Sequence, residues 1–403
     1  MENEIAGPLS GITVIDCTMV LSGPFATMIL ADLGANVIKV EPPYGDGARR
    51  VAPVPPDYVS VAKGASESCD YGAYFGSVNR NKRSIVLDLK QAEDREVFLK
   101  LCDTADAVTE NLRSGVMDDL GIGYEVIKAR NPRIVYGCIR GFGDPRTGES
   151  PYRDWPSYDV IAQAMAGHVH ITGPRTSKGY PAGAAIGDVY PGTLLATGMI
   201  AALFHAQKTG EGQFVDVAMY DAMLALAHDV VSLYGFGRLE MERRDLHHPA
   251  STPFGIYEAS DGSVAIAAPD DKHWAILCEV MERPDLLSDS RMKNKFSRGK
   301  NHEYLEEEIS KWTRSLTKSE VMSALGGKVP CGPVNTGADI FSDPHVYARD
   351  MIVEFTPQGD NPPVSIVGCP IKFNKTPSGV YSRPPKLGEH TEEILSELGL
   401  LDN

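Results

Sequence analysis

The stretch that decides the fold is residues 12–40, ITVIDCTMVLSGPFATMILADLGANVIKV. An apolar run at 12–16 predicts a strand, and Ser22-Gly23-Pro24 predicts the first turn of a helix over 25–33. A second apolar run at 36–40 predicts another strand. A strand, a helix and a strand in this order predict two parallel neighbours in one sheet.

The same alternation continues downstream of this unit. Further strands are predicted at 84–88, 107–110, 133–139 and 213–218, with a charged amphipathic helix at 92–101. These elements predict an α/β fold, a Rossmann-like large domain whose parallel sheet binds ligands at the carboxyl ends of its strands. No GxGxxG follows the first strand and no GxxxxGK[ST] occurs, so dinucleotide and nucleoside-triphosphate binding have no local support.

Composition narrows the class further. The 403 residues include 39 Lys+Arg against 54 Asp+Glu, a formal charge of −15, which disfavours sequence-independent binding of nucleic acid. The seven cysteines are widely spaced without a metal-binding pattern, which predicts a reducing cytoplasm and no metal. No signal peptide or membrane span is apparent from the sequence, so no membrane partner is expected.

Three segments are predicted from the changes in pattern along the chain. Residues 1–220 form the first part of the large domain, including a buried helix at about 193–207. Residues 221–329 form a linker helix and a smaller α+β domain, which contains a hairpin around Ser260-Asp261-Gly262. Residues 330–403 return to the large domain and end in a helix at about 391–398.

The segment most suited to chemistry is Gly187-Asp188, directly before the buried helix. The positive end of a helix dipole favours an ionised carboxylate at Asp188, and Gly187 has no side chain to obstruct a ligand that approaches it. A helix cap explains the same aspartate, because Asp is a preferred N-cap residue. The residues by themselves favour the cap.

Two further features have two interpretations each. Tyr158-Asp159 could bind a ligand or begin a helix. The basic run at 79–83, with Lys90 after the next strand, could face a multiply charged phosphate ligand, although a solvated loop is the commoner explanation of such a run.

The chain resembles the family III CoA-transferases, the group of formyl-CoA transferase, carnitine CoA-transferase and 2-methylacyl-CoA racemase. Each matching block is weak alone, but together they run in order along almost the whole chain. The blocks are residues 9–16, 23–24, 33–41, 81–84, 87–90, 110–115, 185–188, 208–213, 217–219, 330–334 and 387–391.

The resemblance implies that Asp188 is a covalent nucleophile. It would attack an acyl-CoA donor, form an acyl-aspartyl anhydride and then an aspartyl-CoA thioester, and pass CoA to a carboxylic acid. Succinyl-CoA or acetyl-CoA is the expected donor, and a small dicarboxylic or methyl-branched acid is the expected acceptor. No permanently bound cofactor is expected, and the resemblance implies an interlocked homodimer.

The resemblance also implies which residues contact CoA or substrate. The turn after the first strand and several positions at the sheet edge belong to this set, and Lys90 and Arg113 would meet the phosphates. The predicted contacts are Val20, Leu21, Ser22, Arg49, Leu87, Lys90, Asn111, Arg113, Tyr158, Asp159, Gly187 and Met219.

Some positions depart from the family pattern. Met19 stands where the family has a histidine, and the stretch 243–253 has no glycine where formyl-CoA transferase has a glycine-rich loop. His247 and His248 in that stretch are interpreted as an exposed pair rather than as substrate ligands.

The main alternative function is 2-methylacyl-CoA racemisation by abstraction of the α-proton. Racemases of this family have histidine then aspartate where this chain has Tyr158-Asp159. Tyrosine, with an ordinary pKa of about 10, is a poorer base at neutral pH than histidine, whose ordinary pKa is about 6.5. CoA transfer is therefore favoured over racemisation. A second alternative is an inactive CoA-binding member of the family.

Overall fold

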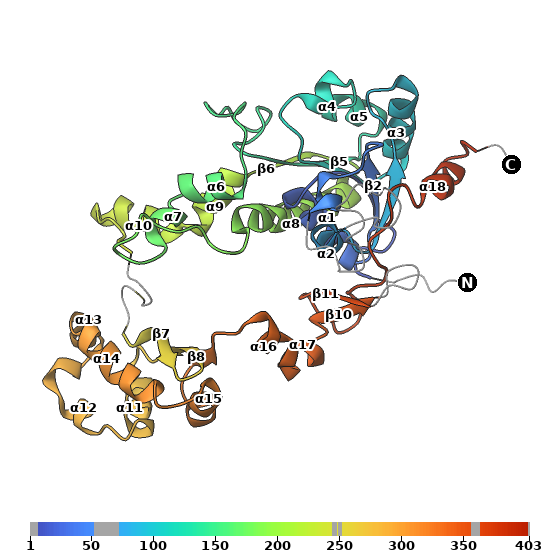
Figure 1. Ribbon diagram of the computed structural model, residues 1–403. Coiled ribbons are helices and arrows are strands. Elements are labelled where there is room, and N and C mark those ends of the chain that lie inside the picture. Colours follow the sequence, from blue (N-terminus) through green and yellow to red (C-terminus); the bar gives the residue numbers. More distant parts are fainter. Residues whose placement is uncertain (1–6, 52–71, 244–247, 249–251, 356–362, 402–403) are drawn as a thin grey trace. The chain divides into compact units, whose positions relative to one another are not determined.

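The chain forms two compact units in the computed structural model (Figure 1). The structure describes residues 7–51, 72–243, 248, 252–355 and 363–401. The large unit comprises Met1–Ala166, Gly183–His228 and Pro344–Asn403, and the small unit comprises Gly167–Ala182 and Asp229–Asp343.

A six-stranded parallel sheet is the centre of the large unit. Its strands are β1 (Thr13–Cys17), β2 (Asn36–Glu41), β3 (Lys82–Val86), β4 (Ala107–Glu110), β5 (Val135–Arg140) and β6 (Phe214–Ala218). They lie in the order β3-β2-β1-β4-β5-β6, and every neighbouring pair is parallel. The predicted α/β, Rossmann-like fold with a parallel sheet is confirmed.

Helices cover both faces of this sheet, which is why its strands are apolar on both sides. On β1, Val14 belongs to the core on one face and its neighbour Ile15 to the core on the other. The first face is covered by α1 (Ser22–Asp32), α6 (Asp159–Met165), α8 (Ile186–Thr209) and α9 (Met219–Leu226). The second is covered by α3 (Ala92–Thr104), α4 (Val116–Asp119), α5 (Tyr124–Arg130) and α18 (Thr391–Glu397).

The predicted buried helix is α8, which is longer than expected at 24 residues. Among the described residues it alone has the length and hydropathy of a membrane span. Leu195, Met199 and Leu203 lie in the core against the sheet, however, and the core helix of a folded domain meets the same criterion. Its apolar character is therefore explained by packing.

The C-terminal segment returns to the edge strand of the sheet. The His390 N–H donates to the Ser84 carbonyl at 3.0 Å, and the Gly388 N–H donates to Ser84 Oγ at 3.0 Å. Two sequence blocks that lie about 300 residues apart therefore contact each other directly. The large unit also contains α2 (Ala73–Val78), α17 (Pro344–Ala348) and the antiparallel pair β10 (Ile352–Phe355) and β11 (Val364–Val367).

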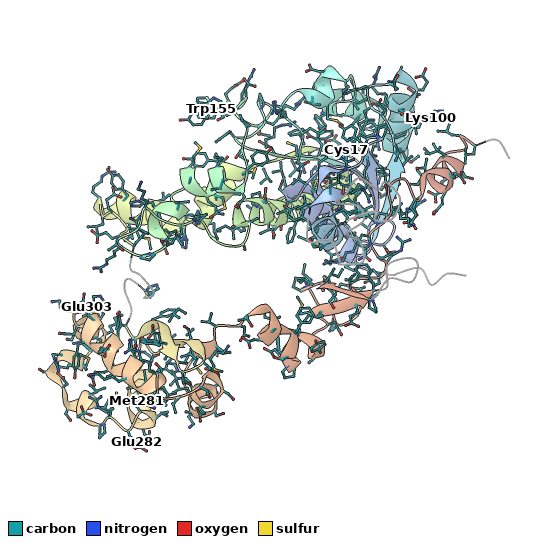
Figure 2. All side chains as sticks on the ribbon, in the orientation of Figure 1. Cys17, Lys100, Trp155, Met281, Glu282 and Glu303 are labelled. Atoms are coloured by element: carbon teal, nitrogen blue, oxygen red, sulfur yellow. The ribbon has the colours of Figure 1, made fainter. Side chains whose placement is uncertain are left out.

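The small unit has its own sheet and core. The predicted hairpin is β7 (Phe254–Ala259) and β8 (Gly262–Ala267), and β9 (Cys331–Pro333) pairs antiparallel with β8. Buried Met281 contrasts with the exposed side chain of Glu282 beside it (Figure 2). The helices of the small unit are α7 (His168–Ile171), most of α10 (His228–Gly237), α11 (Asp271–Val280), α12 (Asp285–Ser288), α13 (Lys295–Lys300), α14 (His302–Thr313), α15 (Lys318–Leu325) and α16 (Gly337–Ser342).

These boundaries differ from the expected breaks after residues 220 and 329. Met223 on α9 lies in the core of the large unit, so the small unit begins only at Asp229. β9 pairs with β8, so the chain leaves the small unit only after Asp343. The segment 167–182 also belongs to the small unit, where Arg243 donates to the carbonyl of Ser177 at 2.8 Å.

Candidate active site

Asp188 is the third residue of α8, within the turn where a helix exposes its free N–H groups. The N-cap position is Ala185, which has no side chain that could cap the helix. The cap interpretation of Asp188 is therefore wrong. Within the part of the chain that the structure describes, no hydrogen bond or ion pair reaches the half-buried carboxylate of Asp188.

Asp159, from a different helix, binds a free N–H group at the start of α8. It begins α6, and its Oδ1 accepts the N–H of Gly187 at 2.7 Å. The Nε2 of Gln163 lies 2.9 Å from both of its carboxylate oxygens. Both oxygens of Asp159, at the start of α6, thus have donors, whereas the carboxylate of Asp188, at the start of α8, has none among the described residues.

This difference controls how Asp188 ionises. Burial raises the pKa of Asp188 to about 6, and the negative charge of Asp159 adds to the increase. Since no donor among the described residues compensates for the lost hydration, the ionised form of Asp188 is held in a less favourable environment than in water. A desolvated carboxylate without hydrogen bonds is a better nucleophile than a solvated one.

The loss of hydration predicts a stability effect that is independent of activity. Since the folded pKa lies above the ordinary value of 3.8, the unfolded chain ionises first as the pH rises, and stability falls between about pH 4 and 6. We expect Asp188→Asn to raise the free energy of unfolding by about 1 to 2 kcal/mol at pH 8, after allowance for partial solvent screening.

The measurement is urea denaturation of both proteins at pH 8 and at pH 4.5. At pH 4.5 the gain should be much smaller because Asp188 is then mostly protonated in the folded protein. An equal gain at both pH values would contradict the explanation by ionisation.

Tyr74, which the sequence did not single out, faces the same carboxylates. Burial raises the pKa of this phenol, and the charges of Asp188, Asp46 and Asp159 raise it further. Its O–H therefore remains protonated and able to donate. No sequence signal identified it, since it precedes the basic run by several residues and belongs to no motif.

An apolar cluster links Tyr74 to the start of α8 and to the turn after β1. Tyr74 and Val189 pack against Leu21, Met28 and Val78. α8 also crosses α1 closely, because a Cβ on Gly192 would lie 2.5 Å from the Ser22 carbonyl. Asp188 is thereby held beside the predicted binding turn, since the residue that follows it is part of this cluster.

The turn between β1 and α1 carries three of the predicted contacts. Val20 is 44% exposed, whereas Leu21 and Ser22 are buried at the start of α1. The side chain of Asn111 is not free for a ligand, because its Oδ1 accepts the N–H of Met19 at 2.7 Å and its Nδ2 donates to the Met19 carbonyl at 2.8 Å. Asn111 therefore shapes the turn.

Two cations remain at the carboxyl edge of the sheet. Lys90 follows β3 and Arg113 follows β4, and both side chains are exposed. Neither forms an ion pair within the described residues. β3 and β4 are three strand spacings of roughly 4.8 Å apart in the sheet. Cations at the ends of these two strands are therefore suited to contact different phosphates of an extended nucleotide.

The match to known proteins agrees with this arrangement. The model of CoA-transferase family III matches residues 9–391. The chain belongs to CoA-transferase family III. It is 44% identical over 394 residues to the succinyl-CoA:mesaconate CoA-transferase of Haloarcula hispanica, which covers 98% of this chain and 97% of that protein.

Two further relatives support the same assignment. The succinate–glutarate CoA-transferase of Agrobacterium fabrum is 36% identical, over 98% of this chain and 96% of that protein. The crystal structure of a CAIB/BAIF family protein from Brucella suis superposes with a TM-score of 0.85 at 32% identity, over 97% of this chain and 99% of that one. The chain is thus a CoA-transferase.

The guanidinium of Arg49, a predicted CoA or substrate contact, is already engaged within the protein. Arg49 is buried, its Nη2 lies 2.6 Å from Glu41 Oε2, and its guanidinium stacks over Phe75 at 3.8 Å. These contacts favour a structural role. The side chains of Leu87 and Met219 are also buried in the two cores of the sheet, so contacts with a ligand would come from their backbone atoms.

Arg80 and Lys82 of the basic run face neither phosphate nor solvent, so both interpretations of the run are wrong for these two residues. Arg80 Nη2 lies 2.6 Å from Asp32, and Lys82 Nζ lies 3.0 Å from Asp16, with all four side chains buried. Arg83 pairs with Glu393 and Glu397 on α18. The run ties β3 to α1, β1 and the C-terminal helix.

The remaining predicted residues are Tyr158, His247 and His248. Tyr158 is 71% exposed at the N-cap of α6 and makes no capping hydrogen bond. His247 lies outside the described residues, as does most of the 243–253 stretch. His248 is exposed, and its ring stacks on Phe254 in the small unit at 5.0 Å. Among described residues, no group of three His, Cys, Asp or Glu could hold a metal ion.

Gly187 has a packing role besides leaving Asp188 open. A Cβ at this position would lie 2.5 Å from the Asp159 carbonyl oxygen and 2.9 Å from its Oδ1. We expect Gly187→Ala to separate α6 from α8, to cost about 1 to 3 kcal/mol of stability and to reduce transferase activity.

The matched control is Gly183→Ala, since a Cβ there meets no atom within 4 Å. Thermal unfolding and initial rates should change little in this variant. If the two variants had the same melting temperature and rate, the close contact would not be functionally important.

Proposed function

We propose that this enzyme transfers CoA from succinyl-CoA to a C4 or C5 dicarboxylic acid, with Asp188 as the covalent nucleophile. The observation that carries the proposal is the half-buried carboxylate of Asp188, which has a pKa of about 6 and no bonding partner among described residues, at the start of α8. The names of the relatives support dicarboxylic substrates, since they include mesaconate and glutarate.

The proposed reaction exchanges one thioester for another. A carboxylate oxygen of Asp188 attacks the thioester carbonyl, the C–S bond breaks, and CoA leaves as a thiolate. The thiolate then attacks the Asp188 carbonyl of the anhydride, which releases succinate and leaves CoA on Asp188 as a thioester. The acceptor carboxylate displaces CoA to form a second anhydride, and the thiolate attacks its acyl carbon, which regenerates Asp188.

The surrounding residues support these steps in distinct ways. Lys90 and Arg113 form no ion pair among the described residues and can bind CoA phosphates, and Val20, Leu21 and Ser22 form the turn beside the reacting group. Tyr74 retains its proton and can donate to a carboxylate or an acyl oxygen. Asp159 holds the N-terminus of α8 through Gly187 and so fixes the position of Asp188.

The test is to incubate the enzyme with succinyl-CoA alone and to trap the adduct with hydroxylamine. We expect a hydroxamate on the peptide that contains Asp188. Labelled mesaconate, glutarate, malate and oxalate are then offered as acceptors, and appearance of the label in a CoA ester identifies the acceptor. Absence of both the adduct and label transfer would contradict the proposal.

The same samples separate the alternatives. A 2-methylacyl-CoA incubated in deuterated water without an acceptor acid should not gain α-deuterium. Deuteration there would indicate a racemase, and binding of CoA without any adduct or exchange would indicate an inactive family member.

We also propose that the enzyme is an interlocked homodimer in a reducing cytoplasm. The helix α10 is apolar but has no buried residue, and Phe236 on it is 96% exposed, so a second chain would cover it. The six described cysteines are free, as a reducing compartment requires. Sedimentation equilibrium tests the dimer, and a monomer at micromolar concentration would contradict it.

A further inference from the structure

We propose that Asp46 is a positioning residue that fixes Val20 in a left-handed backbone conformation and thereby shapes the turn that binds CoA. The part that concerns CoA rests on the proposed function of this turn. The part that concerns the backbone of Val20 rests on the structure alone.

Val20 has a backbone conformation that its side chain disfavours. Its φ is 69°, in the left-handed region, where β-branched residues are genuine outliers because their Cβ substituents crowd the backbone. The side chain is 44% exposed, so burial of Val20 does not explain why the conformation persists. Such strain is maintained only when surrounding contacts enforce it, and it is concentrated at functional sites.

The enforcing contact comes from Asp46, in the loop after β2. The N–H of Val20 donates to Asp46, with distances of 3.1 Å to Oδ1 and 3.2 Å to Oδ2. The Asp46 carboxylate is buried and itself held in place, because Oδ2 lies 3.1 Å from Lys39 Nζ and Oδ1 accepts the N–H of Ala48 at 2.9 Å. A fixed, ionised acceptor makes a stronger hydrogen bond than a neutral one.

The buried Lys39 also binds the backbone of Thr18, two positions before Val20. Its Nζ donates to the Thr18 carbonyl at 2.7 Å, while it also pairs with Asp46. Asn111 binds the N–H and the carbonyl of Met19 between them. The Lys39–Asp46 pair and Asn111 together bind the backbone at three consecutive residues, Thr18, Met19 and Val20.

This arrangement changes what the turn can offer a ligand. The N–H groups of Met19 and Val20 are already used, so these amides cannot bind the phosphates of CoA. The turn therefore contributes a fixed shape and the exposed Val20 side chain. Asp46 would act on binding through the backbone of Val20, without itself touching the ligand.

Rescue by glycine separates this role from general structural support. Glycine adopts positive φ about as readily as negative φ, whereas alanine pays a steric penalty there. If Asp46 serves to hold Val20 left-handed, glycine at position 20 should make Asp46 less necessary. Alanine, which also removes the valine side chain, should not.

The experiment compares wild type, D46A, V20G, V20A, D46A/V20G and D46A/V20A as full-length proteins. CoA itself is the probe, its Kd is measured by calorimetry, and amide hydrogen exchange is followed in a peptide that covers residues 17–24. We expect D46A to weaken CoA binding about tenfold and to speed exchange in this peptide. D46A/V20G should return to within about threefold of V20G, while D46A/V20A should stay about tenfold weaker than V20A.

Equal rescue by glycine and alanine, or wild-type exchange in D46A, would overturn the proposal. If D46A does not fold, D46N replaces it in every comparison with smaller expected changes, because asparagine keeps an acceptor oxygen for the N–H of Val20 but loses the charge that strengthens this hydrogen bond. Neither readout requires turnover. An enzyme without transferase activity would therefore contradict the proposed function and leave the exchange result to decide the role of Asp46.

Discussion

Replacing Asp188 by alanine is expected to lower kcat for CoA transfer by at least about 10⁴-fold, because the proposed mechanism loses the carboxylate that forms its covalent intermediates. Within the described part of the chain the neighbouring carboxylate of Asp159 cannot take over, since Gly187 and Gln163 already bind its oxygens. Binding of CoA should change by less than about threefold, because the cations that we propose as phosphate ligands, Lys90 and Arg113, are unchanged. Initial rates and calorimetric Kd values for CoA measure the two effects.

The matched control for this prediction is Asp159→Asn. The amide oxygen of asparagine can still accept the N–H of Gly187, so the start of α8 keeps its partner. Removal of the negative charge should also lower the pKa of Asp188, because Asp159 helps to raise it. We expect a loss of kcat of about a hundredfold at most and retention of the hydroxylamine-trapped adduct. An Asp188→Ala variant as active as Asp159→Asn would exclude Asp188 as the nucleophile.

Replacing Asp16 by alanine is expected to reduce the free energy of unfolding by about 3 to 5 kcal/mol. Its Oδ2 lies 3.0 Å from Lys82 Nζ and also accepts a hydrogen bond from the Thr27 hydroxyl at 2.7 Å, and all three side chains are fully buried. Alanine would leave the ammonium of Lys82 without its counter-charge in the interior. Urea denaturation of the full-length wild-type and variant proteins measures the loss.

Asp103→Ala is the matched control for Asp16→Ala. Asp103 pairs with Arg130 at 2.6 Å, but both side chains are about one-third exposed, so the expected cost is about 1 kcal/mol or less. Equal losses in the two variants would show that burial of the Asp16 pair is not the reason for its contribution.

The pH dependence of the Asp16 pair provides a further check. Burial would raise the pKa of Asp16, but Lys82 and Lys39 beside it lower it to about 2. Since the folded pKa lies below the ordinary value, the stabilisation is present above about pH 4 and is lost as the pH falls through 2. The difference between wild type and Asp16→Ala should therefore shrink in that range.

The sequence predicted the elements near the site correctly but not their contacts. The apolar runs and Ser22-Gly23-Pro24 predicted β1, α1 and β2 to within a few residues, because periodicity and helix-start residues act locally. Asp188 was correctly expected at a helix start. Its contrast with Asp159 could not be predicted, since it depends on which carboxylate meets the N–H of Gly187 after α6 packs against α8.

The stretch over 220–234 shows the same limit on the local scale. The sequence predicts a single linker helix after residue 220, but the structure has α9 and α10, with Ala227 between them. The two parts belong mainly to different units, so tertiary packing, rather than periodicity, decides where the helix is interrupted.

By itself, the sequence determined the parallel α/β fold, the family and the position of the candidate nucleophile, because strand and helix patterns and the motif blocks are local properties of the chain. Only the tertiary structure decided which charges are available. Arg80 and Lys82 look as free as Lys90 in the sequence, yet the first two are neutralised by Asp32 and Asp16, which lie 48 and 66 residues away. A buried cation must find its counter-charge, and chain folding, not sequence proximity, brings the two together.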